Sequence, residues 1–288
     1  MSAERIATLS CFSGTPTLTP LSGGLTNVNY LVEADNGRFV ARVSEDLSIL
    51  GIDRRSERLC QEAAAKAGVA PRVVHHEERI LVSEFLVGKT LCSEDVRAPD
   101  MLARIAALLR ELHGAWDRIE GELIYFSPFQ TIRTYVATSR RIGAVLPDNI
   151  DVAVERAGEM SHEIRPFRPV LCHNDLLAAN ILDTSAGLRL IDWEYGGIGN
   201  PLFDVAGVCG NCELDEASQR RFVAAYAGQD VDVVLREVRI LKAVSLLRES
   251  LWAVIQTVNA KIEFDYAKYA ADNLAAYERA SEELTCAP

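Results

Sequence analysis

A short set of polar residues between apolar runs constrains this 288-residue chain more than any other feature. His173-Asn174-Asp175 is followed five residues later by Asn180, and Asp192 comes directly after the apolar run Leu188 to Ile191. Short apolar runs separated by turn residues such as Ser185-Ala186-Gly187 are typical of buried β-strands. The pattern therefore predicts a polar loop and an aspartate that are held at the ends of strands.

These residue types match the requirements of phosphoryl transfer from ATP. Negative charge is spread over the transferred group, so a protein mainly has to position Mg²⁺ and the attacking hydroxyl. Asp175 can accept the proton of that hydroxyl, whereas Asn180 and Asp192 offer the oxygen ligands that Mg²⁺ prefers. His173 is expected to brace the loop. Ordinary polar loop residues are the alternative, but the complete set with its flanking strands favours a kinase-type site.

The first 85 residues are expected to be strands with one helix. Asp35-Asn36-Gly37 joins two β-type runs, Asn29 to Ala34 and Arg38 to Val43, and Asn-Gly between such runs predicts a hairpin. A helix is expected over Asp53 to Ala67, ended by the glycine that follows it. Further strands are expected over Arg72 to His76 and Arg79 to Phe85.

The remainder is expected to be mostly helical, with strands returning near residues 170–192. Helices are predicted over Pro99 to His113, Thr131 to Ile142 and Val152 to Ile164. One buried stripe of a later helix is predicted by apolar residues three or four apart, namely Leu241, Val244, Leu247, Leu251 and Val254. The fold class is therefore α+β, with a small β-rich nucleotide-binding lobe (1–86) and a larger helical catalytic lobe (87–288).

The segment before the predicted hairpin is suited to bind phosphate. Gly23 and Gly24 let backbone amides approach an anion closely, and Thr26 and Asn27 can add side-chain donors. A glycine pair alone more often marks a turn. Its position directly before the first hairpin strand favours a nucleotide loop.

A positive charge is expected beside the nucleotide. Arg42 lies in the second hairpin strand, where a guanidinium can contact phosphate oxygens. Glu57 on the following helix can hold it, as a Lys–Glu pair does in protein kinases. The alternative is that Arg42 and Glu57 are ordinary surface charges. Arg38 or Glu62 are neighbouring candidates for the same roles.

Composition and charge argue against several other classes of protein. With 41 acidic and 30 basic residues the net charge is −11, which disfavours nucleic acid as a partner and leaves room for an acidic pocket for a cation. The absence of a long apolar run argues against membrane insertion, and residues 1–5 do not begin a secretory signal. Seven scattered cysteines predict reduced thiols and a cytoplasmic protein, with Cys209 and Cys212 as core residues of a helix. The oligomeric state stays open.

At this point the chain resembles the choline/ethanolamine kinase family, within the aminoglycoside-phosphotransferase-like small-molecule kinases, over nearly its whole length. The motifs that carry the resemblance include Gly23-Gly24-Leu25-Thr26-Asn27, Arg42 with Glu57, Glu84-Phe85-Leu86, Cys172-His173-Asn174-Asp175 with Asn180, and Ile191-Asp192-Trp193-Glu194-Tyr195. The resemblance implies a protein-kinase-like two-lobed fold, with ATP and Mg²⁺ as cofactors. It implies that Glu84 and Leu86 lie at a hinge whose backbone meets adenine, and that Glu194 joins Asn180 and Asp192 as a metal ligand.

The C-terminal part of the resemblance concerns the phosphate acceptor. The segment Ile262 to Ala270 is similar to the family's signature, and it implies an ammonium pocket walled by Trp252 and Tyr269, a place where a cation gains about 0.5–2 kcal/mol. Core aromatics are the alternative for both rings. Glu249 stands where choline kinases carry another tryptophan, and a carboxylate suits an ammonium with N–H donors. This favours ethanolamine or another small amino alcohol over choline.

Three other functions remain open. An aminoglycoside kinase or a thiamine kinase shares the catalytic residues and differs in the acceptor-binding part. A nucleotide-binding pseudokinase is a non-catalytic alternative, and it is expected to lack Asp175, Asn180 or Asp192, all of which are present. The preferred hypothesis is ATP- and Mg²⁺-dependent phosphorylation of a small cationic amino alcohol.

Overall fold

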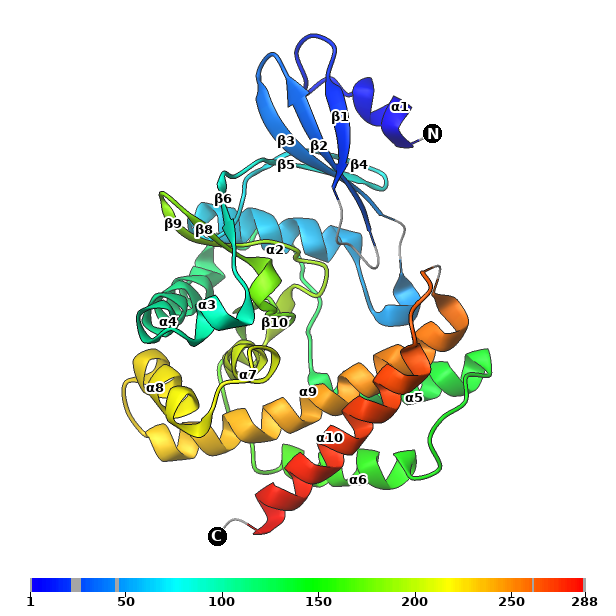
Figure 1. Ribbon diagram of the computed structural model, residues 1–288, viewed down its shortest axis with the longest axis vertical. Coiled ribbons are helices and arrows are strands. Elements are labelled where there is room, and N and C mark those ends of the chain that lie inside the picture. Colours follow the sequence, from blue (N-terminus) through cyan, green and yellow to red (C-terminus); the bar gives the residue numbers. More distant parts are fainter. Residues whose placement is uncertain (1, 22–26, 45–46, 261, 287–288) are drawn as a thin grey trace.

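An antiparallel sheet forms the upper part of the molecule and helices form most of the lower part (Figure 1). The computed structural model describes residues 2–21, 27–44, 47–260 and 262–286. The sheet has the strand order β1-β2-β3-β5-β4. Its strands are β1 (Thr17–Leu21), β2 (Val28–Ala34), β3 (Gly37–Val43), β4 (Val73–Glu77) and β5 (Ile80–Glu84). The predicted α+β, two-lobed fold is confirmed.

Local signals account for the β2–β3 hairpin. Ala34 pairs with Gly37, and Gly37 has a φ of 137°, which is open to glycine and unfavourable for other residues. Val32 pairs with Phe39, and both are buried together with Ile6 in a small core of the upper part. Neither β1 nor the helix α1 (Ser2–Ala7) was predicted, so the expectation of one helix in the first 85 residues is wrong.

The helix α2 (Arg54–Lys66) lies beneath the sheet and faces the lower part (Figure 1). Asp53 caps its start by accepting a hydrogen bond from the Ser56 amide at 2.7 Å. Gly68, with a φ of 76°, follows its end. Glu57 and Gln61 are one turn apart and both are buried, so α2 presents a polar buried face toward the middle of the molecule.

The lower part is built around one long helix, α9 (Val231–Asn259), which packs against α5, α7, α8 and α10. The predicted apolar stripe from Leu241 to Val254 is buried, as expected. The other helices are α3 (Ser93–Arg97), α4 (Pro99–Gly114), α5 (Pro128–Ile142), α6 (Ile150–Ser161), α7 (Pro201–Asn211), α8 (Glu216–Ala227) and α10 (Tyr266–Cys286). In the described ranges, no helix combines the length and the apolar character that a membrane crossing requires.

Two helix boundaries differ from expectation. Helix α5 begins at Pro128, three residues earlier than predicted, because Ser127 caps it and proline is favoured at the first helical position. Helix α6 covers Ile150–Ser161, whereas Val152 to Ile164 was predicted. Its weak apolar pattern left both ends poorly defined.

Cys209 lies in α7 and Cys212 caps its end, and both are buried as predicted.

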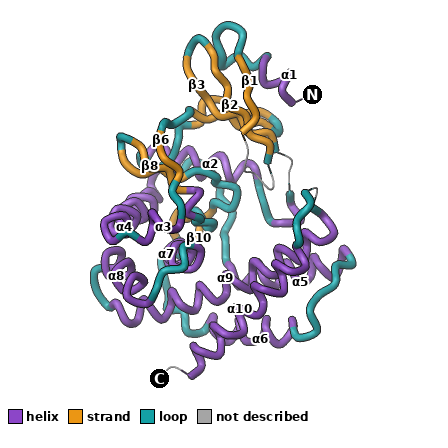
Figure 2. The backbone as a smooth tube through the Cα atoms, viewed as in Figure 1, coloured by secondary structure: helices purple, strands orange, loops and turns teal. Residues whose placement is uncertain are grey.

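Short strands also lie below the upper sheet, among the helices (Figure 2). They are β6 (Gly88–Thr90), β7 (Val170–Cys172), β8 (Ile181–Thr184), β9 (Gly187–Leu190) and β10 (Gly197–Gly199). The predicted turn at residues 185–187 joins β8 to β9, and β6 pairs with β8. The lobe boundary after residue 86 stays a prediction, which the pairing of β6 with β8 supports.

Candidate active site

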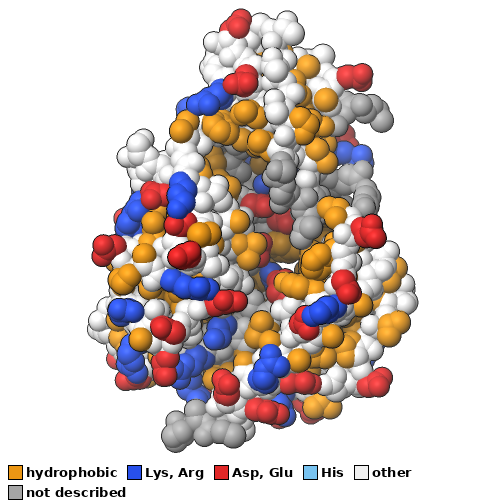
Figure 3. Space-filling view, viewed as in Figure 1, with side chains coloured by type: hydrophobic (Ala, Val, Ile, Leu, Met, Phe, Trp, Pro, Cys, Tyr) orange, Lys and Arg blue, Asp and Glu red, His pale blue; other side chains and the backbone are white. Residues whose placement is uncertain are grey.

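A cavity of about 800 Å³ lies between the upper sheet and the lower helices. Figure 3 shows this face hollowed at that level, with acidic side chains visible inside. Most of the predicted site residues line the cavity: Asn27, Arg42, Glu84, Leu86, Asp175, Asn180, Asp192, Glu194, Glu249, Trp252 and Tyr269. His173 and Glu57 are buried behind its wall. Gly23, Gly24 and Thr26 lie outside the described residues.

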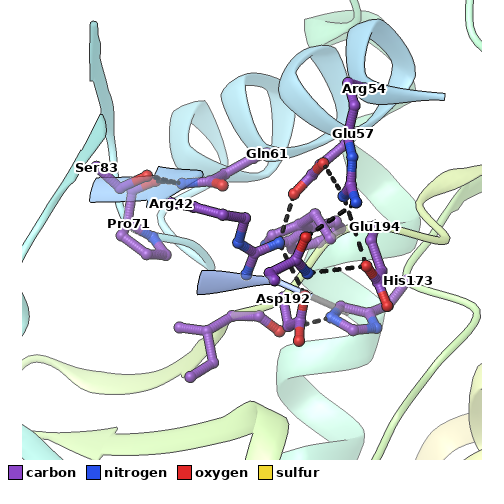
Figure 4. A network of polar contacts seen from close by, with 12 residues as sticks. Arg42, Arg54, Glu57, Gln61, Pro71, Ser83, His173, Asp192 and Glu194 are labelled. Carbon is purple, nitrogen blue, oxygen red and sulfur yellow. Dashed lines mark hydrogen bonds and ion pairs between the residues drawn. The ribbon is translucent and has the colours of Figure 1, made fainter. Parts of the chain in front are cut away.

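Arg42 of β3 lines the cavity and contacts one carboxylate of α2 and one that follows β9 (Figure 4). Its Nη1 donates to Glu57 Oε1 at 2.5 Å and lies 2.9 Å from Asp192 Oδ1. These carboxylates raise the pKa of Arg42 despite its burial, so the guanidinium stays charged. The two alternative residues contact other groups. Arg38 lies over the Phe85 ring, and Glu62 pairs with Arg58.

The guanidinium of Arg54 completes this network, although Arg54 was not predicted as a site residue. Arg54 Nη1 donates to Glu57 Oε2 at 2.8 Å, and its Nη2 donates to Asn27 Oδ1 at 2.9 Å. Asn27 Nδ2 in turn donates to Glu194 Oε2 at 3.0 Å. Arg54 precedes Glu57 by three residues, a spacing that places both on one face of α2, and this signal was available in the sequence.

The loop that carries Asp175 is fixed by Asp204 at the start of α7. Asp204 Oδ2 accepts from the His173 amide at 2.8 Å, and Oδ1 accepts from the Asn174 amide at 2.7 Å. The His173 ring lies 2.9 Å from the Ile191 carbonyl. Burial lowers the pKa of His173, so a neutral ring braces the loop.

His113 and Cys172 lie close to Asp204, with ligand atoms all within 4.8 Å of one another. His113 Nε2 is 3.2 Å from Asp204 Oδ2, and Tyr226 is 2.7 Å from His113 Nδ1. Both Asp204 oxygens already accept loop amides, and burial raises the pKa of the Cys172 thiol. The cluster is therefore a structural support of the loop.

An unusual backbone conformation points Asp192 into the cavity. Asp192 has a φ of 67°, which is uncommon for residues other than glycine. The next residue, Trp193, is fully buried, donates to the Leu190 carbonyl at 3.1 Å and packs on the His173 ring at 4.8 Å. The buried tryptophan thus anchors the turn that exposes the carboxylate.

The oxygen-bearing side chains of this wall fit a magnesium ion. Asn180 Nδ2 donates to the Asp175 carbonyl at 2.9 Å, which leaves the side-chain oxygen as the atom that could ligate a metal. Asp192 and Glu194 line the same wall. Burial and the neighbouring Asp192 raise the pKa of Glu194. A divalent cation would relieve this crowding of negative charge, and oxygen donors are the ligands that Mg²⁺ prefers.

Asp175 lies between this wall and the helix α9. Burial raises the pKa of its carboxyl group to about 7, and Arg248 on α9 opposes that rise. Arg248 Nη2 is 3.5 Å from Asp175 Oδ1. A group with such a pKa can accept a proton near neutral pH. Arg248 was not predicted as a site residue, because an Arg-Glu pair within a helix resembles ordinary surface charge.

Aromatic rings and a carboxylate form the far side of the cavity. The Trp252 and Tyr269 rings lie 6.5 Å apart, and Phe264, missed as a site residue, lies 5.8 Å from Tyr269. Glu249 is three residues before Trp252 on α9 and lines the cavity with all three rings. Ring faces and a carboxylate together suit a small cation.

Asp204→Asn tests the support of the loop. We expect the free energy of unfolding to fall by about 2–5 kcal/mol, because asparagine has one acceptor oxygen for two buried amides. Denaturant unfolding measures this. The control Asp232→Asn removes an exposed ion pair with Arg220 and should change stability by less than about 1 kcal/mol. Equal stability of the two variants would contradict this role for Asp204.

Comparison with known proteins agrees with this architecture. Residues 17–241 match the family described as "Phosphotransferase enzyme family". Protein LicA of Haemophilus influenzae is 26% identical over 277 residues, covering 91% of this chain and 79% of that protein. A probable ethanolamine kinase A of Dictyostelium discoideum is 26% identical over 300 residues, covering 88% of this chain and 82% of that protein.

A solved structure resembles the chain over its full length. The crystal structure of a choline/ethanolamine kinase family protein from Mesorhizobium loti superposes with a TM-score of 0.80 at 26% identity, covering 100% of this chain and 94% of that one. The family match spans well over half of the residues. The chain belongs to the phosphotransferase enzyme family and is a small-molecule kinase.

Proposed function

We propose that the protein transfers the γ-phosphoryl group of ATP to the hydroxyl of a small cationic amino alcohol. One observation carries the proposal: a single cavity holds Asp175, Asn180 and Asp192 next to a carboxylate with aromatic rings. The first set suits phosphoryl transfer, and the second suits an ammonium group. Relatives named as choline or ethanolamine kinases support the same acceptor class.

The nucleotide is proposed to bind under the sheet. Leu86 and Glu84 line the cavity where the upper sheet ends, in agreement with an adenine site at the hinge. The Glu84 carboxylate pairs with Arg72 at 3.0 Å, so any contact with adenine comes from the backbone. Arg42, held by Glu57, lies where it can contact phosphate oxygens.

The reaction follows from these placements. The acceptor oxygen forms a bond to the γ-phosphorus, the bond from that phosphorus to the bridging oxygen of the β-phosphate breaks, and the hydroxyl proton passes to Asp175. The products are a phosphomonoester and ADP. Asn180, Asp192 and Glu194 are the proposed ligands of Mg²⁺, which when bound neutralises phosphate charge. Arg42 adds a fixed positive charge, and His173 keeps the loop in place.

The acceptor is proposed to carry a primary ammonium, as in ethanolamine. Its N–H groups can donate to Glu249, whereas a quaternary ammonium has no such donors. Trp252, Tyr269 and Phe264 then cover the carbon atoms. Choline, which has no N–H group to donate to Glu249, is expected to be the poorer of the two acceptors.

A coupled assay of ADP release tests the proposal. Ethanolamine, choline, thiamine and an aminoglycoside are each compared with a reaction that lacks an acceptor. We expect the largest kcat/KM with ethanolamine and a smaller value with choline. Higher activity with thiamine or the aminoglycoside would replace the proposed acceptor. Absence of acceptor-dependent turnover with all four would favour a nucleotide-binding pseudokinase.

Trp252→Leu tests the aromatic wall. We expect the KM for ethanolamine to rise about 2- to 30-fold with little change in kcat, because a cation over an aromatic face gains about 0.5–2 kcal/mol. Steady-state kinetics measures both constants. Trp116→Leu is the matched control, since Trp116 is exposed and does not line the cavity. A Trp252 variant with the KM of the wild type would place the ammonium elsewhere.

A further inference from the structure

Arg248 is a buried cation that lines the same cavity as the proposed acceptor-binding residues. Only 4% of its side chain is exposed, and its guanidinium lies 5.0 Å from the Tyr195 ring and about 6 Å from those of Phe126 and Phe203. Burying a guanidinium is costly unless carboxylates compensate its charge. The groups that provide this compensation therefore indicate what the residue does.

Two carboxylates of the cavity share one nitrogen of Arg248. Its Nη2 makes a short hydrogen bond to Glu249 Oε1 and lies 3.5 Å from Asp175 Oδ1. Its Nη1 donates to the Asn174 carbonyl at 3.4 Å, directly before Asp175 in the chain. Arg248 thus joins the proposed proton acceptor to the proposed ammonium-binding carboxylate.

The shared nitrogen has an energetic consequence. Nη2 divides its hydrogen bonding between two acceptors, and Glu249 holds the closer position. An ammonium that binds Glu249 takes up part of that carboxylate's charge. Arg248 Nη2 then interacts less with Glu249 and can approach Asp175 more closely. This contact orients the Asp175 carboxylate, which must accept the hydroxyl proton. Binding of the cation and orientation of the base become linked through one side chain.

We propose that Arg248 is a positioning residue that couples the charge of the acceptor at Glu249 to the orientation of Asp175. This inference rests on the proposed function. It implies that the positive charge of the acceptor increases kcat as well as affinity, because an uncharged acceptor leaves the Arg248 guanidinium hydrogen-bonded to Glu249. It also implies that lysine is a poor replacement, since one ammonium cannot hold two carboxylates and a carbonyl in the same planar geometry.

A double-mutant cycle on acceptor kinetics tests the coupling. We compare the wild type, Arg248→Met, Glu249→Gln and the double variant, with ethanolamine as acceptor. Arg248→Met should lower kcat at least about tenfold, and Glu249→Gln should raise KM and also lower kcat. In the double variant, the fold-loss of kcat/KM should be about tenfold smaller than the product of the fold-losses in the two single variants. Both substitutions break the same link, so their effects should not multiply. Arg248→Lys should recover only part of kcat.

The control variant is Arg239→Met, also on α9, which removes an exposed ion pair with Glu216 of α8 and should keep the kinetics of the wild type. Additive effects in the cycle, or a Glu249→Gln variant with unchanged kcat, would overturn the coupling while the proposed function stands. If Arg248→Met does not fold, Arg248→Lys replaces it in the same cycle. If the wild type phosphorylates no amino alcohol, the proposed function fails and the coupling falls with it.

Discussion

Asp175→Asn is expected to lower kcat by about 10²–10⁴-fold, the usual contribution of a positioned general base. Asparagine keeps the size of the side chain and removes its ability to accept the hydroxyl proton. The loop should stay in place, because Asp204 holds it through the amides of the two preceding residues. Binding of ATP, measured by calorimetry, should be nearly unchanged.

The pH dependence of the wild type follows from the same group. Burial raises the pKa of Asp175 to about 7, and the ionised form is the one that accepts a proton. The kcat/KM should therefore be low at acid pH and rise as the pH increases through about 7. The Asp175→Asn variant should lack this rise.

The direction in which Asp175→Asn changes the free energy of unfolding can also be predicted. A carboxyl group whose pKa is raised on folding, here from 3.8 to about 7, lowers the free energy of unfolding as the pH rises between these two values, and the loss is complete above the higher one. At pH 8 the neutral asparagine should therefore leave the free energy of unfolding unchanged or higher. Asp100→Asn on the surface of α4 is the matched control for activity. Turnover close to that of the wild type in Asp175→Asn would remove Asp175 from the mechanism.

Asp192→Asn is expected to lower activity at least about 10²-fold at a Mg²⁺ concentration that saturates the wild type, because one negative metal ligand is lost. The Mg²⁺ concentration for half-maximal rate should increase as well. Arg42 keeps its contact with Glu57 in this variant, so the guanidinium remains anchored. Initial rates over a Mg²⁺ titration at fixed ATP measure the effect.

Asp183→Asn is the control for this titration. Asp183 lies in β8 and pairs with Arg104 near the surface, away from the lining of the cavity. The Mg²⁺ dependence of the Asp183→Asn variant should match that of the wild type. A Mg²⁺ dependence unchanged by Asp192→Asn would assign metal binding to other residues.

Most of the architecture could be predicted because its signals are local. The turn Asp35-Asn36-Gly37 and the apolar alternation on both sides of it define the β2–β3 pairing. The spacing from Leu241 to Val254 defines the buried face of α9. By contrast, α1 has six residues and little amphipathic pattern, and its Ile6 is buried only because the sheet covers it.

The candidate site could be predicted only in part. His173 to Asp175, Asn180 and Asp192 were predicted as site residues because phosphoryl transfer requires those side chains at that spacing, and Asp175, Asn180 and Asp192 line one cavity. Arg248 lies 73 residues after Asp175, and its burial depends on three rings from other segments. Phe264 likewise reaches the cavity only through the packing of α10 on α9. Such contacts arise from tertiary packing and leave no local pattern.

Phosphorus NMR of a reaction mixture with ATP, Mg²⁺ and ethanolamine tests the central claim most directly. We expect a phosphomonoester signal that grows in step with ADP in the wild type and is absent with Asp175→Asn. Formation of inorganic phosphate with ADP, and no phosphomonoester of the amino alcohol, would contradict it.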